Sequence, residues 1–288
     1  MSFFSNLFGK DKGADNPGGQ ISITPEAFFQ TQYISNLIQK YKRTATVLNP
    51  RKSQGPVPPS ESKFGGLPNF EGFATYPCCD SCGTPLNFVL QLYKKDFPAF
   101  YFPGNTNLFQ LFRCPNYDCS TSYSELYDHK MFHYYFEASP ACPKQLPKPP
   151  SLLKEAESEV PDCYLVPMLA DDFPNFDDFE DDDFNAIEKK YGSEYAEIFM
   201  DQCFSLQRTK FGGYPSYTQS PVYPTCACGN TKDFFFQLSS EDHEEGQGYS
   251  SSGQWSSHGI MIGDVGNIYY YICKACGPES IESNWDCY

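Results

Sequence analysis

A short motif occurs twice in this chain, and the same succession of features follows each copy. Lys63-Phe64-Gly65-Gly66 recurs as Lys210-Phe211-Gly212-Gly213, and a Tyr-Pro pair lies twelve residues after each Phe, at Tyr76 and Tyr223. Each copy then has a cysteine pair, an apolar run with a Gln near its end, an aromatic run and a second cysteine pair. A repeated order of this kind indicates a duplicated supersecondary unit. We therefore predict an internal duplication with halves near residues 63–138 and 210–278.

The apolar runs of both halves predict β-strands. The runs at residues 87–92, 108–113, 234–238 and 268–272 are rich in aromatic and branched residues and are bounded by Gly and Pro. Aromatic residues make up 17% of the chain, and 24 Pro and 21 Gly favour many turns over long helices. We predict an α+β, β-rich fold with an internally duplicated, pseudo-two-fold architecture and a zinc knuckle in each half.

Eight cysteines fall into two sets of four that have the spacing of structural metal sites. In each half a close cysteine pair is followed by a second pair, 32 residues on in the first half and 45 residues on in the second. Two such pairs place four thiolates around one tetrahedral Zn²⁺, and a Gly directly after a pair suits the tight turn. We predict two structural Zn²⁺ per chain. Their ligands are Cys79, Cys82, Cys114 and Cys119 in the first half and Cys226, Cys228, Cys273 and Cys276 in the second.

Other uses of these cysteines remain alternatives. An iron–sulfur cluster, disulfides or free thiols are open, but an odd total of 13 cysteines favours metal over disulfides. Cys78 could replace Cys79 as a ligand. The repeat favours Cys79, because Cys79 and Cys226 both lie 15 residues after the Phe of the motif. Four thiolates leave no position for water, so we expect structural rather than catalytic sites. The remaining cysteines are expected to be buried small apolar residues: Cys142, Cys163, Cys203 and Cys287.

The rest of the chain is predicted to connect and flank these repeats. Residues 1–62 are expected to comprise a disordered N-terminus, a helix that begins at Thr24-Pro25, and a linker. Residues 63–140 form the first repeat with its zinc site, and residues 210–288 form the second. Residues 141–209 are expected to be a Pro-rich and acidic linker plus a helix near 185–203, which Gly192 weakens in the middle. The acidic, Phe-rich block 171–184 is interpreted as solvated linker or, alternatively, as a docking or self-masking segment.

Charge and hydropathy limit the partners. The net charge is −15 and the pI is about 4.6, which argues against nucleic-acid binding and favours a basic protein partner. No apolar run approaches the roughly 20 residues that span a bilayer, and residues 1–10 lack the pattern of a secretory signal. We therefore predict a cytoplasmic protein without a membrane span.

No catalytic constellation stands out in the sequence. His129 and His133 are four residues apart in an aromatic, strand-like segment, and we interpret them as structural. His243 and His258 lie in polar segments without a pattern. If a site existed between the two halves, its polar groups would be Gln91, Gln237 and Asp264, although Asp264 is in a turn-forming context.

Two families resemble this chain over about residues 63–120 and 210–277. The pattern F-G-G-x-P, then Y-P, then a strand ending in Gln, twice over, resembles the YwqG-like family of bacterial proteins of unknown function, and Asp264-Val265-Gly266 fits it too. The segment from Cys79 to Gln91, C-x2-C-G-x-P-L-x-F-x-L-Q, is similar to the eukaryotic programmed cell death protein 2 family. The first resemblance implies a duplicated α+β fold. The second implies a dedicated chaperone of a small-subunit ribosomal protein.

These observations together predict a zinc-stabilised protein-binding module, such as a client-specific chaperone or adaptor for a basic protein, and favour a non-enzymatic role. Two alternatives stay open. One is an enzyme with its site between the repeats, and the other is a metal or redox sensor, which needs exposed and exchangeable cysteines.

Overall fold

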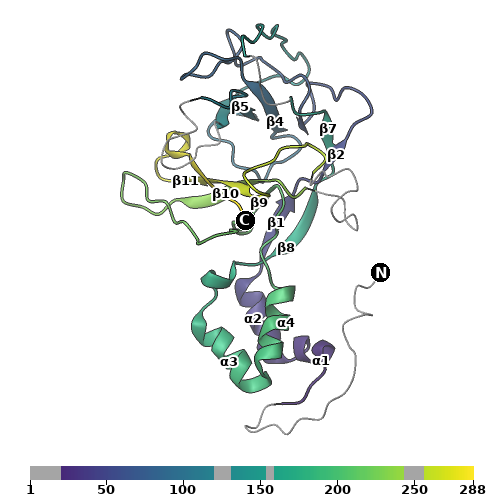
Figure 1. The fold of residues 1–288 in the computed structure, drawn as a ribbon, viewed down its shortest axis with the longest axis vertical. Helices are drawn as coiled ribbons and strands as arrows, with labels where there is room; N and C mark the ends of the chain where they lie inside the picture. The colour runs from purple at the N-terminus through teal and green to yellow at the C-terminus, as the bar shows by residue number, and fades with distance from the viewer. Residues whose placement is uncertain (1–20, 120–130, 154–158, 243–255) are drawn as a thin grey trace. The chain divides into compact units, whose positions relative to one another are not determined.

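The computed structural model describes residues 21–119, 131–153, 159–242 and 256–288 (Figure 1). These residues divide into two compact units. One is helical and contains the residues up to Lys40 together with Phe179–Cys203; the other contains Tyr41–Asp178 and Phe204–Tyr288. The predicted disordered N-terminus up to residue 20, His129 and His243 lie outside the described residues.

The helical unit is built from two pairs of short helices. The predicted helix start is confirmed, because the Thr24 hydroxyl accepts a hydrogen bond from the Ala27 N–H at 3.3 Å and Pro25 opens the helix. Phe28 is the centre of the packing, with its ring centroid 5.0 Å from those of both Tyr191 and Tyr195. The helices are α1 (Pro25–Phe29), α2 (Gln32–Tyr41), α3 (Asp181–Tyr191) and α4 (Ser193–Gln202).

The second helix pair corrects one expectation and agrees with the weak point expected at Gly192. Helix α3 begins within the block 171–184 that was interpreted as linker, because Asp181, Asp182 and Asp183 fill its first turn, where negative charge is stabilised by the helix dipole. The single helix predicted near 185–203 is split at Gly192, whose φ of 102° lies outside the helical region. Lys40 of α2 pairs with Asp183 at 2.7 Å, so the acidic turn also binds the first helix pair.

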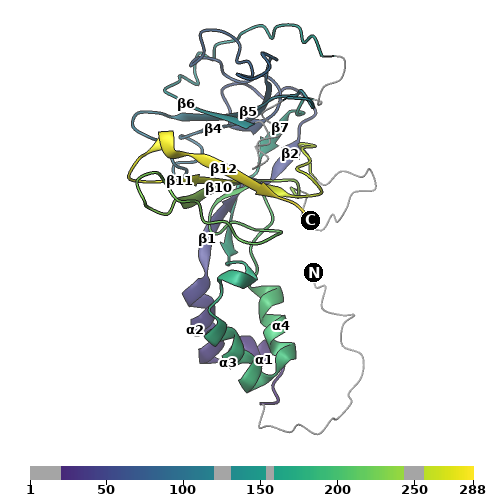
Figure 2. The same ribbon diagram turned by 60° about the vertical axis from the view of Figure 1, so that its left-hand side comes forward.

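The β unit contains two six-stranded sheets in which all neighbouring strands are antiparallel (Figures 1 and 2). The predicted β-rich class is therefore confirmed. Sheet A has the order β12 (Glu282–Asp286), β11 (Asn267–Ile272), β10 (Asp233–Ser239), β9 (Lys210–Gly212), β1 (Arg43–Val47) and β8 (Met168–Asp172). Sheet B has the order β6 (Met131–Phe136), β5 (Leu108–Arg113), β4 (Asn87–Tyr93), β3 (Lys63–Phe64), β7 (Cys163–Leu165) and β2 (Pro50–Lys52).

The chain crosses between the sheets at two places, through four strands that the sequence did not predict. The chain passes directly from β1 in sheet A to β2 in sheet B, and from β7 in sheet B to β8 in sheet A. The two crossings lie side by side, since Val47 pairs with Met168 and Pro50 pairs with Leu165. Residues 49–62 are thus not only a linker: their first residues supply the edge strand of sheet B.

An aromatic core fills the space between the sheets. Phe109 of sheet B lies 6.0 Å from Phe236 of sheet A between ring centroids, and Phe100 lies 5.9 Å from the same ring. Phe64 and Phe211, from the two copies of the repeated motif, belong to the same buried cluster. Large aromatic side chains bury more area than aliphatic ones, so the high Phe and Tyr content is explained by this shared core.

Corresponding strands carry the same irregularity in both sheets. The β4–β5 register shifts between Phe88 and Leu90, and the β10–β11 register shifts between Phe234 and Phe236. The four consecutive strands β6-β5-β4-β3 and β12-β11-β10-β9 have the same order. A bulge re-aims the side chains beside it, so the same bulge gives both sheets the same pattern of inward residues.

Candidate metal centres

The first cysteine pair of sheet B lies on a tight turn before β4. The Cys79 N–H donates to the Thr84 carbonyl at 2.8 Å, and the Gly83 N–H donates to the Cys79 carbonyl at 2.8 Å. Gly83 has a φ of 69°, which an L side chain adopts at a cost, so the glycine after the C-x2-C pair has a conformational reason. The turn presents both cysteines on one side.

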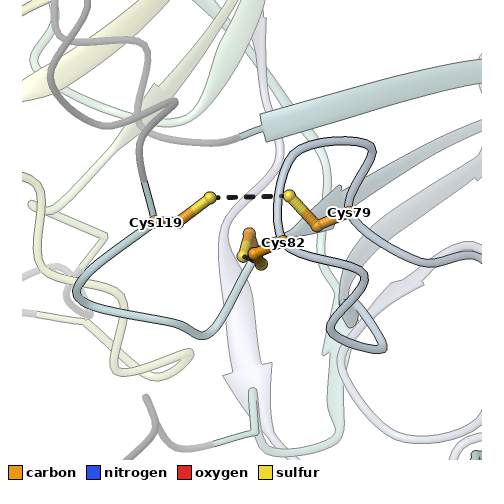
Figure 3. Close-up of side chains that lie close together, drawn as sticks. Cys79, Cys82 and Cys119 are labelled. Atoms are coloured by element: carbon orange, nitrogen blue, oxygen red, sulfur yellow. Dashed lines mark hydrogen bonds between the residues drawn. The ribbon is translucent and has the colours of Figure 1, made fainter.

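The second pair completes this cluster from the end of β5 (Figure 3). Cys114 directly follows the last residue of β5, and the backbone N–H of Cys119 is bound to the Asn116 carbonyl at 3.2 Å. The Cys119 and Cys79 sulfurs are 3.6 Å apart, and the Cys82 and Cys114 sulfurs are also 3.6 Å apart. The cluster therefore joins a turn before one strand to the end of its neighbour.

Sheet A repeats this arrangement at β10 and β11. The Cys226 N–H donates to the Asn230 carbonyl at 2.8 Å, and Cys273 directly follows β11. The Cys226 and Cys276 sulfurs are 3.7 Å apart, and the Cys228 and Cys273 sulfurs are 3.6 Å apart. The shorter C-x-C spacing still brings two thiols to one point.

Both donor sets fit a tetrahedral metal ion. The structure brings together the eight predicted cysteines, and within each set of four all sulfurs lie within 4.8 Å of one another. Zn–S bonds of about 2.3 Å give a tetrahedron whose sulfurs are about 3.8 Å apart, close to the separations found here. A disulfide requires about 2.0 Å between sulfurs, and all these cysteines are free. Cys78 is exposed, and its thiol donates to the Tyr76 carbonyl.

In each cluster the pKa of one thiol is lowered. Burial opposes ionisation of Cys82, but hydrogen bonds with the side chain and backbone of Thr84 outweigh it and lower the pKa of this thiol to about 6. In the second cluster, the backbone N–H of Asn230 lowers the pKa of Cys228 to about 7. Burial instead raises the pKa of Cys79 and of Cys114, while the neighbouring thiols raise the pKa of Cys276 to about 12.

The other cysteines separate into two groups. Cys163 and Cys203 are buried, as predicted, and burial raises the pKa of each to about 12. The prediction is wrong for Cys142, which is exposed, and for Cys287, which is half-buried. Neither of these lies in a core strand: Cys142 is in a turn after β6 and Cys287 follows the edge strand β12.

A buried histidine–carboxylate pair was missed in the sequence. His258 is 1% exposed, its Nε2 lies 3.2 Å from Asp242, and its ring stacks on Phe64 at 4.8 Å. Its Nδ1 accepts the Ile260 N–H at 3.0 Å and lies 3.1 Å from the Ser256 hydroxyl. With Nδ1 accepting, Nε2 carries the hydrogen toward Asp242. Because both ring nitrogens have protein partners, the pair anchors residues 256–260 to Asp242. The sequence does not reveal this pair, since His258 and Asp242 come together only in the folded structure.

The polar groups considered for a site between the halves are used within their own sheets. Gln91 and Gln237 are fully buried; their side-chain oxygens accept the N–H groups of Asn69 and Ser216 at 3.1 Å and 2.8 Å. Their amide nitrogens donate to backbone carbonyls of the segments before β3 and β9. Asp264 is exposed in the turn before β11. His133 lies on β6, where burial lowers its pKa.

Two antiparallel sheets that share an aromatic core, each with a four-cysteine cluster at the end of one strand pair, define a class of β-rich proteins with two candidate metal centres. Within that class, a family described as a domain of unknown function, DUF1963, matches residues 62–287, and the chain belongs to this family. The YwqG-like resemblance is thereby confirmed, whereas the resemblance to the programmed cell death protein 2 family stays a prediction.

A curated bacterial protein is similar to part of the chain. The chain is 37% identical over 82 residues to a protein of Salmonella typhimurium named "Uncharacterized protein YpfL". The match covers 28% of this chain and 15% of that protein. Across the parts of the chain that the structure describes, no helix has the length and apolar character needed to cross a bilayer.

Proposed function

We propose that this chain is a zinc-stabilised protein-binding module for a basic partner, acting as a client-specific chaperone or adaptor in the cytoplasm. The observation that carries the proposal is the closure of both cysteine clusters, each with four thiols that converge on one point. Four thiolates saturate zinc and leave no position for a substrate. The metal then holds strand ends together, so the surface of the sheets is where a partner protein would bind.

Charge and exposed apolar residues support protein binding. The net charge of −15 attracts a basic partner and repels nucleic acid. The crossing from β7 to β8 exposes a run of apolar side chains, with Leu169 73% exposed. The exposed residues of this run are Tyr164, Val166, Met168 and Leu169. Contiguous exposed apolar surface is typical of a protein-interaction site.

We further propose that the two sheets descend from an internal duplication. Matching strand order, the bulge at the same place in β4 and β10, and the identical roles of Gln91 and Gln237 all support it. A duplication accounts for two cysteine clusters with the same placement on their strands.

Elemental analysis of freshly purified full-length protein tests the metal part of the proposal. We expect two zinc ions per chain, one after Cys79→Ser, and two after Cys78→Ser, which changes the adjacent exposed thiol. A metal content of zero in the unmodified protein, or iron in place of zinc, contradicts it. For the binding part, a defined basic protein such as a purified small-subunit ribosomal protein is titrated at low salt. Absence of saturable binding to any such basic protein contradicts a basic partner.

A metal or redox sensor is the second candidate, and the exposure of Cys228 and Cys276 favours it for the second cluster. Exposed thiolates exchange metal and react with oxidants more readily than buried ones. Chelator-induced zinc release from the second cluster, followed together with far-UV circular dichroism, separates the two functions. Release without unfolding supports a sensor, whereas release coupled to unfolding supports a structural metal.

A further inference from the structure

An aromatic cavity of about 390 Å³ lies on sheet A beside the second cysteine cluster. We call it the aromatic cavity; it is lined chiefly by Tyr214, Tyr217, Tyr223, Phe234, Tyr271 and Asp233. Tyr217 and Tyr271 are joined through their hydroxyls at 2.6 Å, and the Tyr223 hydroxyl donates to Asp178. These hydrogen bonds hold the Tyr217, Tyr223 and Tyr271 rings in the wall of the cavity.

Sheet B has a cavity at the corresponding place, of only about 230 Å³. Its wall comes from the same positions of the repeated pattern. The corresponding pairs are Leu67 and Tyr214, Pro68 and Pro215, Phe70 and Tyr217, Tyr76 and Tyr223, and Phe88 and Phe234. The remaining wall of the smaller cavity includes Leu146 and Lys148, from the segment that follows β6.

That segment shows what kind of ligand this part of the sheet accepts. The Phe70 N–H donates to the Lys144 carbonyl at 2.9 Å, and the Lys144 N–H donates to the Asn69 side chain at 2.9 Å. Leu146 packs against the buried cluster around Phe70, and the Lys148 Nζ donates to the Asn87 Oδ1 at 2.7 Å and to the Glu159 Oε1 at 2.6 Å. A Pro-rich segment without regular secondary structure thus lies here, held by the backbone of Lys144, with one apolar and one basic side chain lining the site.

The aromatic cavity has a carboxylate at the position where its counterpart has the Asn87 amide. Asn87 of β4 pairs with Arg113 and lies one residue before the register shift of sheet B. Asp233 of β10 pairs with Ile272 and lies one residue before the register shift of sheet A, so it is the equivalent of Asn87. A carboxylate therefore occupies the position of the amide that accepts from Lys148, and it can supply the counter-charge that Glu159 supplies to Lys148 in sheet B. The present partner of Asp233 is Lys274, which is 75% exposed, and such surface pairs contribute little.

The rings of the aromatic cavity also suit a cation. The Arg43 guanidinium already lies 4.0 Å from the centroid of the Tyr214 ring. Lys232, the other cation of the wall, is engaged by Glu282. Aromatic faces next to a carboxylate bind ammonium groups through the ring quadrupole.

We propose that the aromatic cavity binds a lysine side chain carried on an extended segment of a partner protein, with an apolar residue two positions before the lysine, as Leu146 precedes Lys148. This inference rests on the proposed function and specifies the chemistry of the basic partner. Asp233 binds the ammonium group, and the ring faces contact the methylene stem.

A fluorescein-labelled peptide with the sequence of residues 143–150 is the probe, titrated into zinc-loaded full-length protein and followed by anisotropy. We expect saturable binding, weakened about tenfold or more both by Asp233→Asn and by norleucine at the position of Lys148 in the peptide, because each removes one charge of the pair. Combined, the two changes are expected to cost little more than either alone. Asp264→Asn, the same change at an exposed aspartate in the turn before β11, serves as the control and should leave the affinity unchanged.

Absence of saturable binding, or binding that Asp233→Asn and the norleucine peptide leave unchanged, overturns the inference. Zinc content and circular dichroism of Asp233→Asn establish that the variant is folded. If a purified basic protein binds equally to the unmodified chain and to Asp233→Asn, the proposed function stands and the aromatic cavity is excluded as its site. If the peptide binds at Asp233 but no basic protein binds, the cavity assignment stands and the proposed function fails.

Discussion

Each copy of the repeated motif contains one buried lysine, and each lysine forms an ion pair with a different aspartate. Lys63 Nζ lies 3.2 Å from Asp162, next to β7, and Lys210 Nζ lies 2.8 Å from Asp172, at the end of β8. Both lysine side chains and Asp172 are fully buried, whereas the Asp162 side chain is 25% exposed. Burial lowers the pKa of Lys210 to about 8, against the opposing effect of Asp172. A buried charge of this kind depends on its partner.

Replacing the two lysines should therefore have unequal effects. Lys210→Met leaves the Asp172 carboxylate buried, so we expect the free energy of unfolding to fall by about 3–5 kcal/mol. Lys63→Met should cost less because Asp162 reaches water. Urea unfolding measures both, and Lys42→Met, which removes an exposed pair with Asp171, should change stability by at most about 1 kcal/mol. Equal losses for Lys210→Met and Lys63→Met would contradict this reasoning.

The glycine pair of the motif is required for the same ion pairs. Gly66 has a φ of 66°, and a Cβ there would lie 2.0 Å from the Asp162 Oδ1. Gly83 has a similar φ of 69° but nothing within 4 Å of its Cβ position. Gly83→Ala should cost about 1–2 kcal/mol for the left-handed backbone alone, and Gly66→Ala more, since Asp162 must also move. Unfolding of both variants at full zinc occupancy tests this, and the explanation fails if Gly66→Ala is the milder change.

At the scale of elements, each cysteine cluster stabilises one strand pair. Cys114 and Cys273 follow β5 and β11, and the cysteines that face them precede β4 and β10. Cys114→Ser should release one zinc and lower hydrogen-exchange protection in β4 and β5, while β10 and β11 keep theirs. Cys142→Ser, at an exposed cysteine outside both clusters, is the matched control. Loss of protection in both sheets at once would show that the clusters do not act on separate strand pairs.

Strands were predictable from the sequence where their own residues set them apart. β4, β5, β10 and β11 are long apolar runs bounded by turns, and the structure confirms them. β1, β2, β7 and β8 have three to five residues and mixed composition, as in RTATV and MLADD. Such segments become strands because a neighbouring strand accepts their hydrogen bonds, and that neighbour is distant in the chain.

For the whole molecule, the repeat predicted the cysteine sets because each copy has two close cysteine pairs in the same order relative to its apolar runs. It did not predict that the two sheets share one aromatic core, with Phe100 in contact with Phe236. It also did not predict that His258 stacks on Phe64 and binds Asp242, because Phe64 is distant from His258 in the sequence and Asp242 belongs to no motif. Local patterns define elements, whereas contacts between the sheets depend on how those elements are placed.

Net charge leads to a prediction at this largest scale. A chain of charge −15 attracts a basic partner over distances comparable with the Debye length, which is about 10 Å at 0.1 M salt. Raising the salt concentration should therefore slow association with the lysine peptide, by about tenfold or more between 0.02 and 0.3 M, because long-range attraction acts mainly on the encounter rate. Dissociation should change less, since close contacts at Asp233 are screened less than distant charges. Stopped-flow anisotropy separates the two rates, and a peptide with norleucine in place of both lysines should show association that depends much less on salt. If salt acts mainly on dissociation, the surface charge does not steer the partner, and its affinity comes from the contacts in the cavity alone.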